Sequence, residues 1–376
     1  MNIGVDIRVL ANGEDGGIAQ YLLNLLPELF KIDRSIKFKL FFSSSKKIKI
    51  RYDWLSEKNV ELFKFRTPNH LLFASSRFLS RPLADKMLGG ADIFFSPHFF
   101  LAPVSSNCKS VVTFHDLSFV RHPEFFSWRQ NFWHSFEMKP RQQAEKADKI
   151  IAVSRSTRND LVSLFGINPD KIKIIYSGVS GKFFQEPEKA ELEKVKTKYQ
   201  LPDKFFLFLG KIEPRKNILG IFKAFSYLYE RKLIAEEPNL VVAGGLGWLY
   251  KDILKFYAVS PYKRLIKFVG KVDEEDKPAL YFLSKVFIYP SFFEGFGFPP
   301  LEAMAADKPV IVSKTSSLPE ITGNSAILVD PYNILEIAQA MANLWLNPAI
   351  FEGSKKQAKK FSWERTAEAT LAVLLE

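Results

Sequence analysis

The chain has 376 residues, enough for two domains of ordinary size, and its 47% hydrophobic and 25% charged residues are typical of a globular protein. The single cysteine, Cys108, excludes an intrachain disulfide framework and fits a reducing cytoplasm. No apolar run of about 18 residues occurs, and MNIGVDIRVL predicts a first strand instead of a signal peptide. We therefore expect a cytoplasmic protein that is soluble or peripheral on the inner membrane face.

The net charge of +12 is unevenly distributed. Residues 31–90 hold 14 basic and 5 acidic side chains, a net of +9, together with several aromatic residues and leucines. Such a segment suits an anionic membrane surface or a phosphate-bearing acceptor, and a solvated basic face over core-facing apolar residues is the equal alternative. Because no recognised nucleic-acid-binding motif accompanies the charge, we expect no nucleic acid partner.

The first strand, residues 3–9, leads into Gly16 and Gly17 and then into an amphipathic helix over residues 18–30. A glycine-rich turn between a strand and a helix lets the backbone approach a ligand closely. The full spacing of the dinucleotide-binding fingerprint is absent, so the turn alone is weak evidence. We predict that Gly16 and Gly17 contact a donor substrate.

Three further strands are expected, at 38–42, 92–95 and 110–114, and the last ends at His115. Open parallel sheets bind ligands at the carboxyl ends of their strands, where an imidazole can hydrogen-bond a sugar hydroxyl or a phosphate. The alternative is a structural histidine in a loop.

An aromatic stripe at near-helical spacing follows between residues 127 and 144. Its members are Trp128, Phe132, Trp133 and Phe136. We expect core packing for this stripe, with part of it as an alternative lining of an acceptor site. Strands at 150–154 and 170–178 then close the first half of the chain.

Residues 182–203 are polar and charged, which predicts an interdomain linker with a short helix. The strand–helix alternation then restarts, and cations follow the strand at 205–209 next to a glycine. Such cations can neutralise a diphosphate and the charge that builds on it when a bond breaks. The candidates for this role are Gly210, Lys211, Arg215 and Lys216.

A strand at 286–289, a glycine loop and a helix over 301–306 form the most informative stretch. Such a junction directs backbone N–H groups and a helix dipole at a ligand, which favours phosphate. Glu294 precedes the helix and Glu302 is expected in its first turn, so both carboxylates can accept hydrogen bonds from hydroxyls in one pocket. The other donor-site candidates are Gly295, Phe296, Gly297, Phe298 and Leu301.

Glu294, seven intervening residues and Glu302, within EGFGFPPLEAMA, resemble the paired-glutamate motif of the family 4, or group 1, retaining glycosyltransferases. KPVIV, SLPEI and LVDP downstream are also similar to that family. Two positions depart from its pattern. Asp307 stands where glycine is usual, and Lys211 stands where many members have arginine, so Arg215 is expected to supply the bidentate contact.

The resemblance implies the α/β GT-B fold, with two Rossmann-like doubly wound domains facing across a cleft. The expected divisions are an acceptor domain over 1–182, a donor domain over 183–360, and a helix over 361–376 that crosses back to the first domain.

The resemblance also implies a retaining transfer without metal or cofactor. Lys216 would hold the diphosphate, Glu302 the ribose hydroxyls and Glu294 the donor sugar, with His115 on the opposite wall. No Asp-x-Asp pair or histidine cluster with ligand spacing is present.

Similarity to bacterial polysaccharide mannosyltransferases favours GDP-mannose over UDP-hexoses and dTDP-rhamnose, with a saccharide or lipid-linked saccharide as acceptor. One alternative is a nucleotide-sugar epimerase of the same fold, which should carry a carboxylate acid/base pair in the first domain. The other is a non-enzymatic saccharide- or membrane-binding module, which would have no reason to keep Lys216, Glu294 and Glu302 together.

Overall fold

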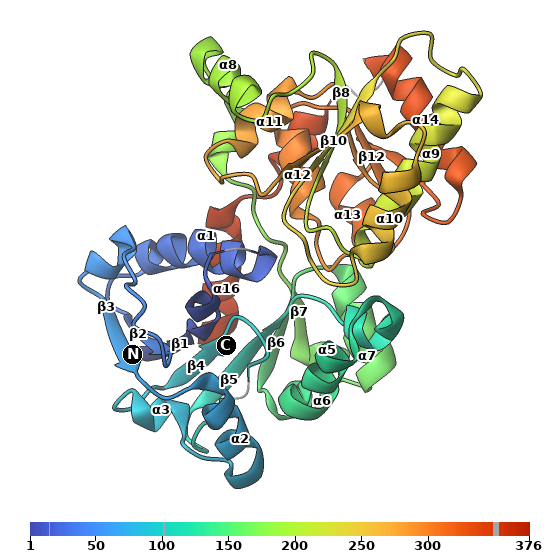
Figure 1. Cartoon of the computed structure of the whole chain (residues 1–376). Coiled ribbons are helices and arrows are strands. Elements are labelled where there is room, and N and C mark those ends of the chain that lie inside the picture. Colours follow the sequence, from blue (N-terminus) through green and yellow to red (C-terminus); the bar gives the residue numbers. More distant parts are fainter. Residues whose placement is uncertain (15, 101, 349–352) are drawn as a thin grey trace. The chain divides into compact units, whose positions relative to one another are not determined.

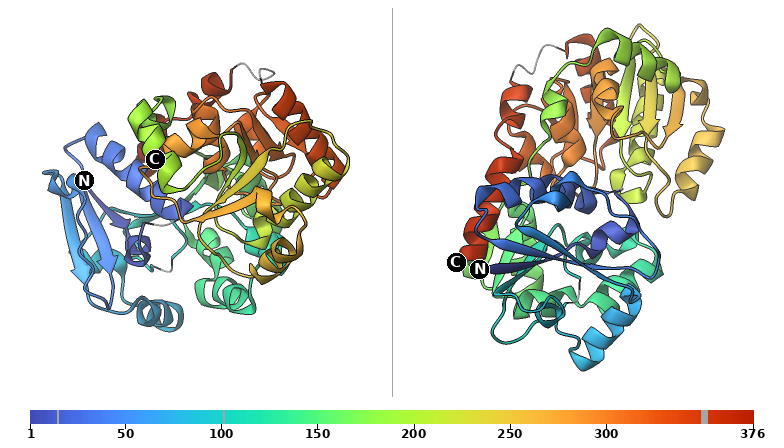
Figure 2. Two further views of the ribbon diagram at one scale, coloured as in Figure 1. Left: turned by 45° about the horizontal axis from the view of Figure 1, so that its top comes forward. Right: turned by 90° about the vertical axis from the view of Figure 1, so that its left-hand side faces the viewer.

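The computed structural model describes residues 1–14, 16–100, 102–348 and 353–376. The chain divides into two compact units, each with one parallel sheet on which helices pack (Figures 1 and 2). The first unit contains 1–121, 128–178 and 362–376, and the second contains 122–127 and 179–361. No helix within the described ranges is long and apolar enough to cross a membrane.

The sheet of the first unit has the strand order β3-β2-β1-β4-β5-β6-β7, with every neighbouring pair parallel. Its strands are β1 (Asn2–Asp6), β2 (Lys37–Ser43), β3 (Val60–Phe65), β4 (Ile93–Ser96), β5 (Lys109–Phe114), β6 (Lys149–Ala152) and β7 (Ile172–Ile174). The order reverses between β1 and β4. The loops after these two strands therefore diverge at the carboxyl edge, the place where such sheets bind ligands.

Two strand predictions in this sheet need correction. The first strand ends at Asp6 instead of residue 9, because the backbone N–H and guanidinium of Arg8 both bond the Asp6 carboxylate and a 3-10 turn, Arg8–Asn12, follows. The strand β3 was not expected. It is an edge strand that exposes Glu61 on one face and Lys64 on the other, so its sequence shows neither a continuous apolar run nor a regular alternation.

Helices flank this sheet. They are α1 (Gly17–Ile32), α2 (Asn69–Leu79), α3 (Ala84–Met87), α4 (Ser118–Arg121), α5 (Trp128–Phe132), α6 (Pro140–Lys146), α7 (Arg155–Phe165) and α16 (Trp363–Leu375). The helix α1 buries a leucine stripe that includes Leu22, Leu25 and Leu29, and it packs against α16. The C-terminal helix α16 therefore completes the core of the first unit, although it follows the second unit in sequence.

The second sheet has the order β10-β9-β8-β11-β12-β13, again all parallel. Its strands are β8 (Phe205–Leu209), β9 (Asn239–Ala243), β10 (Ile266–Gly270), β11 (Val286–Tyr289), β12 (Val310–Ser313) and β13 (Ile327–Val329). Every residue of β8, β11 and β12 is buried, as expected for continuous apolar runs in a parallel sheet. The order reverses between β8 and β11.

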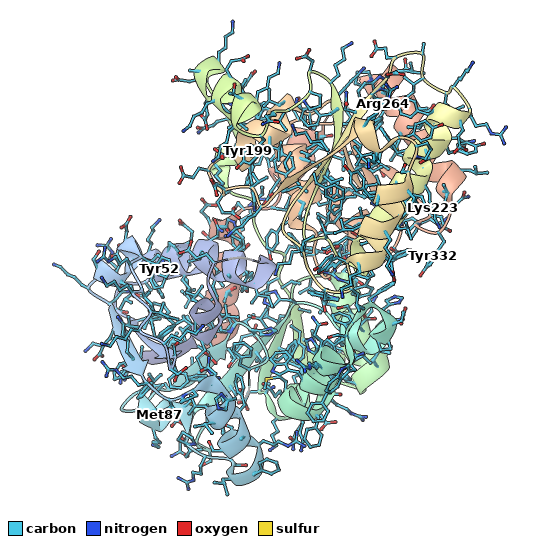
Figure 3. The ribbon with its side chains drawn as sticks, viewed as in Figure 1. Tyr52, Met87, Tyr199, Lys223, Arg264 and Tyr332 are labelled. Atoms are coloured by element: carbon cyan, nitrogen blue, oxygen red, sulfur yellow. The ribbon has the colours of Figure 1, made fainter. Side chains whose placement is uncertain are left out.

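The helices of the second unit are α8 (Lys189–Lys198), α9 (Ile218–Glu230), α10 (Lys251–Val259), α11 (Lys277–Leu283), α12 (Phe298–Ala305), α13 (Leu318–Thr322), α14 (Ile334–Leu346) and α15 (Ser354–Ala358). The expected linker at 182–203 instead belongs to this unit, because α8 packs on α11. At its end Lys198 pairs with Asp276, and Tyr199, labelled in Figure 3, donates a hydrogen bond to the same carboxylate.

A short segment from the first half of the chain, His122–Ser127, also belongs to the second unit. The Phe125 ring stacks on Phe292 with centroids 5.2 Å apart, and the Trp248 indole donates to the Phe125 carbonyl at 2.6 Å. The segment therefore supports the loop that follows β11. Nothing in its sequence indicated this packing, because it lies far from residues 248 and 292 along the chain.

The aromatic stripe does not pack as expected. Trp128, Phe132 and Phe136 are 73%, 47% and 47% exposed, and only Trp133 is half-buried. The core-packing prediction is wrong for the three exposed residues. A π-helical turn, Trp133–Met138, follows the short helix α5, so the uninterrupted helical spacing that the prediction assumed is broken.

Candidate active site

The loops after β8 and β11 meet at the switch point of the second sheet and bring opposite charges together. Lys216 Nζ lies 2.6 Å from Glu294 Oε1, and Arg215 Nη1 lies 3.1 Å from Glu294 Oε2. Arg215 Nη1 also donates to the Phe293 carbonyl at 2.7 Å. The three side chains that the sequence nominated separately therefore form one cluster.

Two residues that the sequence analysis did not nominate complete this cluster. Glu213 accepts a hydrogen bond from Arg215 Nη2 at 2.8 Å, and the Tyr289 hydroxyl accepts one from Lys216 Nζ at 2.7 Å. Glu213 lies two residues before the nominated Arg215, and Tyr289 ends an otherwise apolar strand. A polar tip at a strand end was therefore the signal available for Tyr289.

Charge pairing inside the cluster keeps Glu294 ionised. Burial alone would raise its pKa, but the charges of Arg215 and Lys216 outweigh burial and lower the pKa to about 2. Burial and the adjacent Arg215 lower the pKa of Lys216, while Glu294 opposes that shift. With Glu213 included, two carboxylates balance two cations, so the cluster is close to neutral before any ligand arrives.

The glycine loop after Glu294 is held in shape by two serines. Ser317 Oγ donates to the carbonyls of Glu294 and Phe296, and Ser316 Oγ accepts from the Glu294 N–H. Gly297 has φ +113°, and a side chain there would come within 2.7 Å of a Leu318 methyl carbon, so glycine is required.

Backbone donors in this loop remain available. Within the ranges that the structure describes, no group accepts a hydrogen bond from the N–H of Gly295, Phe296 or Gly297, although all three residues are buried. Buried N–H groups are nearly always paired in native proteins, so this loop is suited to an oxygen-rich ligand.

The second glutamate of the motif lies in a separate hydrogen-bond network. Glu302 is in the second turn of α12, because the helix begins at Phe298, so the prediction of a first-turn position is wrong by about one residue. Glu302 Oε2 accepts a hydrogen bond from the Tyr281 hydroxyl at 2.8 Å. Burial raises the pKa of Glu302, although the charge of Lys277 partly opposes the shift.

The remaining nominated residues of this unit differ in position. Lys211 is exposed, and it forms no ion pair with another described residue. Gly210 donates its N–H to the Ala243 carbonyl, and Gly244 approaches it so closely that a side chain on Gly244 would lie 1.9 Å from the Gly210 oxygen. Leu301 is fully buried in the core, and Phe296 and Phe298 contact each other through their rings.

His115 follows β5 at the carboxyl edge of the first sheet. Its Nε2 lies 2.7 Å from the Pro97 carbonyl, which can only accept, so Nε2 carries the proton and Nδ1 is an acceptor in the neutral ring. Burial lowers the pKa of His115, which keeps the ring neutral. The Tyr21 ring from α1 meets the imidazole edge-on at 4.9 Å.

The glycines nominated in the first unit begin the helix that carries Tyr21. Gly16, with φ +117°, is the N-cap of α1 and Gly17 is its first residue. His98, which the sequence analysis missed, lies with its ring 5.9 Å from His115, and burial lowers its pKa well below the usual value. No sequence signal singles out His98 in the apolar run that contains it.

Two carboxylates that follow strands of the first sheet have local partners. Asp116 Oδ1 accepts from both the N–H and the hydroxyl of Ser118, and Asp6 is paired with Arg8 in the interior. No group of three or more metal-ligating side chains occurs among the described residues.

Comparisons with known proteins identify the family of the chain. Residues 189–362 match the family model "Glycosyl transferases group 1" and residues 15–181 match "Glycosyltransferase Family 4". O-antigen chain mannosyltransferase B of Escherichia coli is 30% identical over 369 residues, which cover 94% of each chain. Serotype-specific mannosyltransferase WbdA of Escherichia coli is 33% identical over 271 residues, 70% of this chain and 33% of that protein.

Solved structures share the fold. Sucrose-phosphate synthase from Thermosynechococcus elongatus superposes with a TM-score of 0.79 at 18% identity, covering 99% of this chain and 98% of the other. That likeness, and the two parallel sheets, establish two Rossmann-like domains of the GT-B fold. The chain therefore belongs to the family 4, or group 1, glycosyltransferases.

Proposed function

We propose that this glycosyltransferase moves mannose from GDP-mannose to a hydroxyl of a saccharide or lipid-linked saccharide, with retention of configuration and without a metal ion. The observation that carries the proposal is the buried cluster of Arg215, Lys216 and Glu294 at the switch point of the second sheet. The available N–H groups of the adjacent glycine loop support it.

The leaving group is a nucleoside diphosphate. When the bond between the sugar C1 and the diphosphate oxygen breaks, negative charge builds on that oxygen. Lys216, Arg215 and the loop N–H groups are fixed donors that stabilise this charge. The acceptor oxygen then bonds C1 on the same face, and the acceptor proton passes to the departing diphosphate.

Glu294 changes partners in this scheme. Before the donor binds, its two carboxylate oxygens accept from Lys216 and Arg215. Once the diphosphate engages those cations, the oxygens can accept from sugar hydroxyls instead. In the ligand-free cluster the pKa of Glu294 is lowered to about 2, so its carboxylate is ionised and ready to accept when the donor arrives.

The reaction is expected to pass through an oxocarbenium-like state without a covalent intermediate. Asp6, at the end of β1, is paired with Arg8, and Asp116, next to His115, accepts from Ser118, so neither is placed as one half of an acid/base pair. This arrangement supports transfer over epimerisation. Glu302 would bind the ribose, and the Nδ1 acceptor of His115 would accept from a sugar hydroxyl.

The choice of mannose rests on the relatives. The proteins that are 30% and 33% identical are named as mannosyltransferases, and one is named for an O-antigen chain. Because O-antigen-like polymers are saccharides, a saccharide or a lipid-linked saccharide is the proposed acceptor. The basic segment 31–90 would bring the enzyme to an anionic membrane surface that holds such an acceptor.

A thermal-shift titration tests the donor. We expect GDP-mannose, with or without EDTA, to raise the melting temperature more than UDP-glucose, UDP-GlcNAc, UDP-galactose or dTDP-rhamnose, because a ligand that binds only the native state stabilises it. Stabilisation by a uridine nucleotide alone would overturn GDP-mannose, and loss of the shift in EDTA would overturn metal independence. The one-bond coupling between C1 and H1 of the transferred mannose, measured by NMR, tests retention.

A further inference from the structure

Large apolar side chains are exposed together on one surface of the first unit. We call this surface the aromatic face, and it is made by α2, α5 and the π-helical turn Trp133–Met138. Its exposed members are Leu71 (53%), Phe78 (73%), Leu79 (70%), Trp128 (73%), Phe132 (47%) and Phe136 (47%). Such a contiguous group is uncommon on a soluble protein and marks an interaction site.

Contacts of Arg77 and between rings join the central members of this surface, Phe78, Phe132 and Phe136. The helix α2 packs against the π-helical turn, and the Arg77 guanidinium lies 3.7 Å from the Phe136 ring centroid and 5.3 Å from that of Phe78. The Phe132 and Phe136 rings stack at 4.7 Å. Trp128 lies one helical turn before Phe132, so it extends the same face.

The sequence of α2 explains why it exposes apolar groups. Leu72, Phe73 and Ser76 face the core and are buried, while Leu71 and Phe78 lie on the opposite side. The helix is therefore apolar on both sides, which a helix that only covered a core would avoid. In Figure 1 and in both views of Figure 2, α2 lies at the periphery of its unit.

Basic side chains border the aromatic face. Arg81, Lys86 and Arg129 are exposed around it. A shallow hollow of about 490 Å³ beside α2 is lined by Leu79, Arg81, Lys86 and other residues, with Met87, labelled in Figure 3, among them. Such a hollow combines an apolar wall with two cations, which suits a phosphate-bearing headgroup with its chain.

We propose that the aromatic face inserts into the interfacial region of an anionic lipid bilayer. Aromatic rings and leucines occupy the boundary between headgroups and acyl chains, while arginine and lysine reach the anionic headgroups. This inference rests on the proposed function and deepens it, because it locates the membrane-docking surface. Part of that surface, α2, lies in the basic segment 31–90, and the rest, α5 and the π-helical turn, lies outside it. The charge complementarity of the border selects a lipid surface over a neutral partner.

The aromatic face differs from the lysine-rich loop at residues 46–49, which is another basic part of the segment 31–90. Lys46, Lys47 and Lys49 are exposed, but Ile48 and Ile50 beside them are only half-exposed and no exposed ring accompanies them. That loop can contribute long-range attraction only. Salt should therefore weaken the contribution of the lysine loop and leave that of the aromatic face.

Co-sedimentation with vesicles tests the inference. Vesicles of phosphatidylcholine with about 30 mol% phosphatidylglycerol are titrated with wild type, with the double variant Phe78→Ala/Trp128→Ala, and with the control Lys46→Gln/Lys49→Gln. We expect the aromatic variant to lose at least about tenfold in partition coefficient at every salt concentration, because two large apolar groups no longer leave water. The control should lose affinity at low salt and match wild type in about 0.5 M NaCl.

Fluorescence places the contact. Brominated lipids should quench wild-type tryptophan emission, and Trp128→Phe should remove most of that quenching. A melting curve of each variant serves as the control for correct folding. Wild type that does not bind the vesicles, or an aromatic variant that binds as wild type does, overturns the inference. A wild-type dimer in light scattering that the aromatic variant converts to a monomer, without vesicle binding, would assign the face to self-association instead.

The proposed transferase function and the proposed membrane docking are tested by separate measurements. Donor binding is read from nucleotide-dependent melting without lipid, and docking is read from vesicles without nucleotide. Phe78 and Trp128 take no part in the donor cluster, so transfer to a water-soluble acceptor should be unchanged in the aromatic variant. Loss of donor binding in wild type would remove the transferase proposal and leave the docking measurement standing.

Discussion

At the switch point of the second sheet, two cations and two carboxylates lie within hydrogen-bond distance of one another, whereas the first sheet presents uncharged rings at the corresponding edge. His115 and His98 are both kept neutral there, because burial lowers the pKa of each. The buried ion pair Asp6–Arg8, which follows β1, is turned inward, with the guanidinium 5.1 Å from the Phe41 ring centroid.

The difference supports a proposed division of one architecture between two tasks. In the proposed transfer, a diphosphate that gains charge as a bond breaks would be stabilised by the fixed cations and N–H donors of the second sheet. Sugar hydroxyls would bind the neutral acceptors and apolar ring surfaces of the first sheet. Four predictions test this division, from the largest expected effect to the smallest.

Glu294→Ala should lower turnover by about a hundredfold to a thousandfold, because it removes both a sugar contact and the anion that positions Lys216 and Arg215. Breaking a buried pair also costs about 3–5 kcal/mol of stability, so turnover is measured well below the melting temperature of the variant. The matched control is Glu193→Ala on the exposed side of α8, which should behave as wild type. Turnover near the wild-type level in Glu294→Ala would remove this glutamate from the mechanism.

The neutral rings of the first unit should make the protein sensitive to acid. Burial lowers the pKa of His134 from 6.5 to about 4, although the charge of Asp116 opposes the shift. The unfolded chain therefore binds a proton below about pH 6.5 while the folded chain does not, so stability falls as pH drops from 6.5 towards 4. His134 stacks on Phe119 with ring centroids 4.2 Å apart, and His134→Phe keeps that stacking.

Urea unfolding at pH 7 and pH 5 measures this effect. The stability lost between the two values should be about 2 kcal/mol smaller in His134→Phe than in wild type. Glu294 does not interfere, because its lowered pKa of about 2 places its own contribution below about pH 4.5. Parallel pH profiles for the two proteins would show that His134 is not held neutral by burial.

His115→Ala should lower turnover about tenfold, the effect of losing one hydrogen bond to a hydroxyl, and leave stabilisation by GDP unchanged. The control is His70→Ala, an exposed histidine on α2. Steady-state kinetics and GDP-dependent melting give the two readouts. If GDP binding also fails in His115→Ala, the chemical division between the two sheets is wrong.

Glu302→Gln should weaken donor binding by about fivefold, since a neutral amide accepts hydrogen bonds from ribose hydroxyls less strongly than a carboxylate does. The variant should melt at the same temperature as wild type or above it. Burial raises the pKa of Glu302, so its ionised form costs stability at neutral pH. A markedly lower melting temperature with unchanged donor affinity would make Glu302 a structural residue.

Much of the second unit could be predicted from local sequence. The strands β8 and β11 have the predicted bounds, because each is a continuous apolar run buried on both faces. The bounds of edge and terminal strands were harder to predict from the sequence. β3 has charged residues at positions 61 and 64, on opposite faces, and β7 is only three residues long, although a strand over 170–178 was expected.

The sequence by itself determined which residue types the donor loops carry, since the cations after β8 and the glutamate and glycines after β11 are adjacent along the chain. Tertiary structure decided their partners. Lys216 and Glu294 are 78 residues apart and meet only because the strand order reverses between β8 and β11. Tertiary structure also decided which aromatic rings are exposed to water. The spacing of apolar residues predicts the faces of a helix, but the burial of each face depends on what packs against it. Among the described residues, nothing packs over Phe78 or Trp128 enough to cover them.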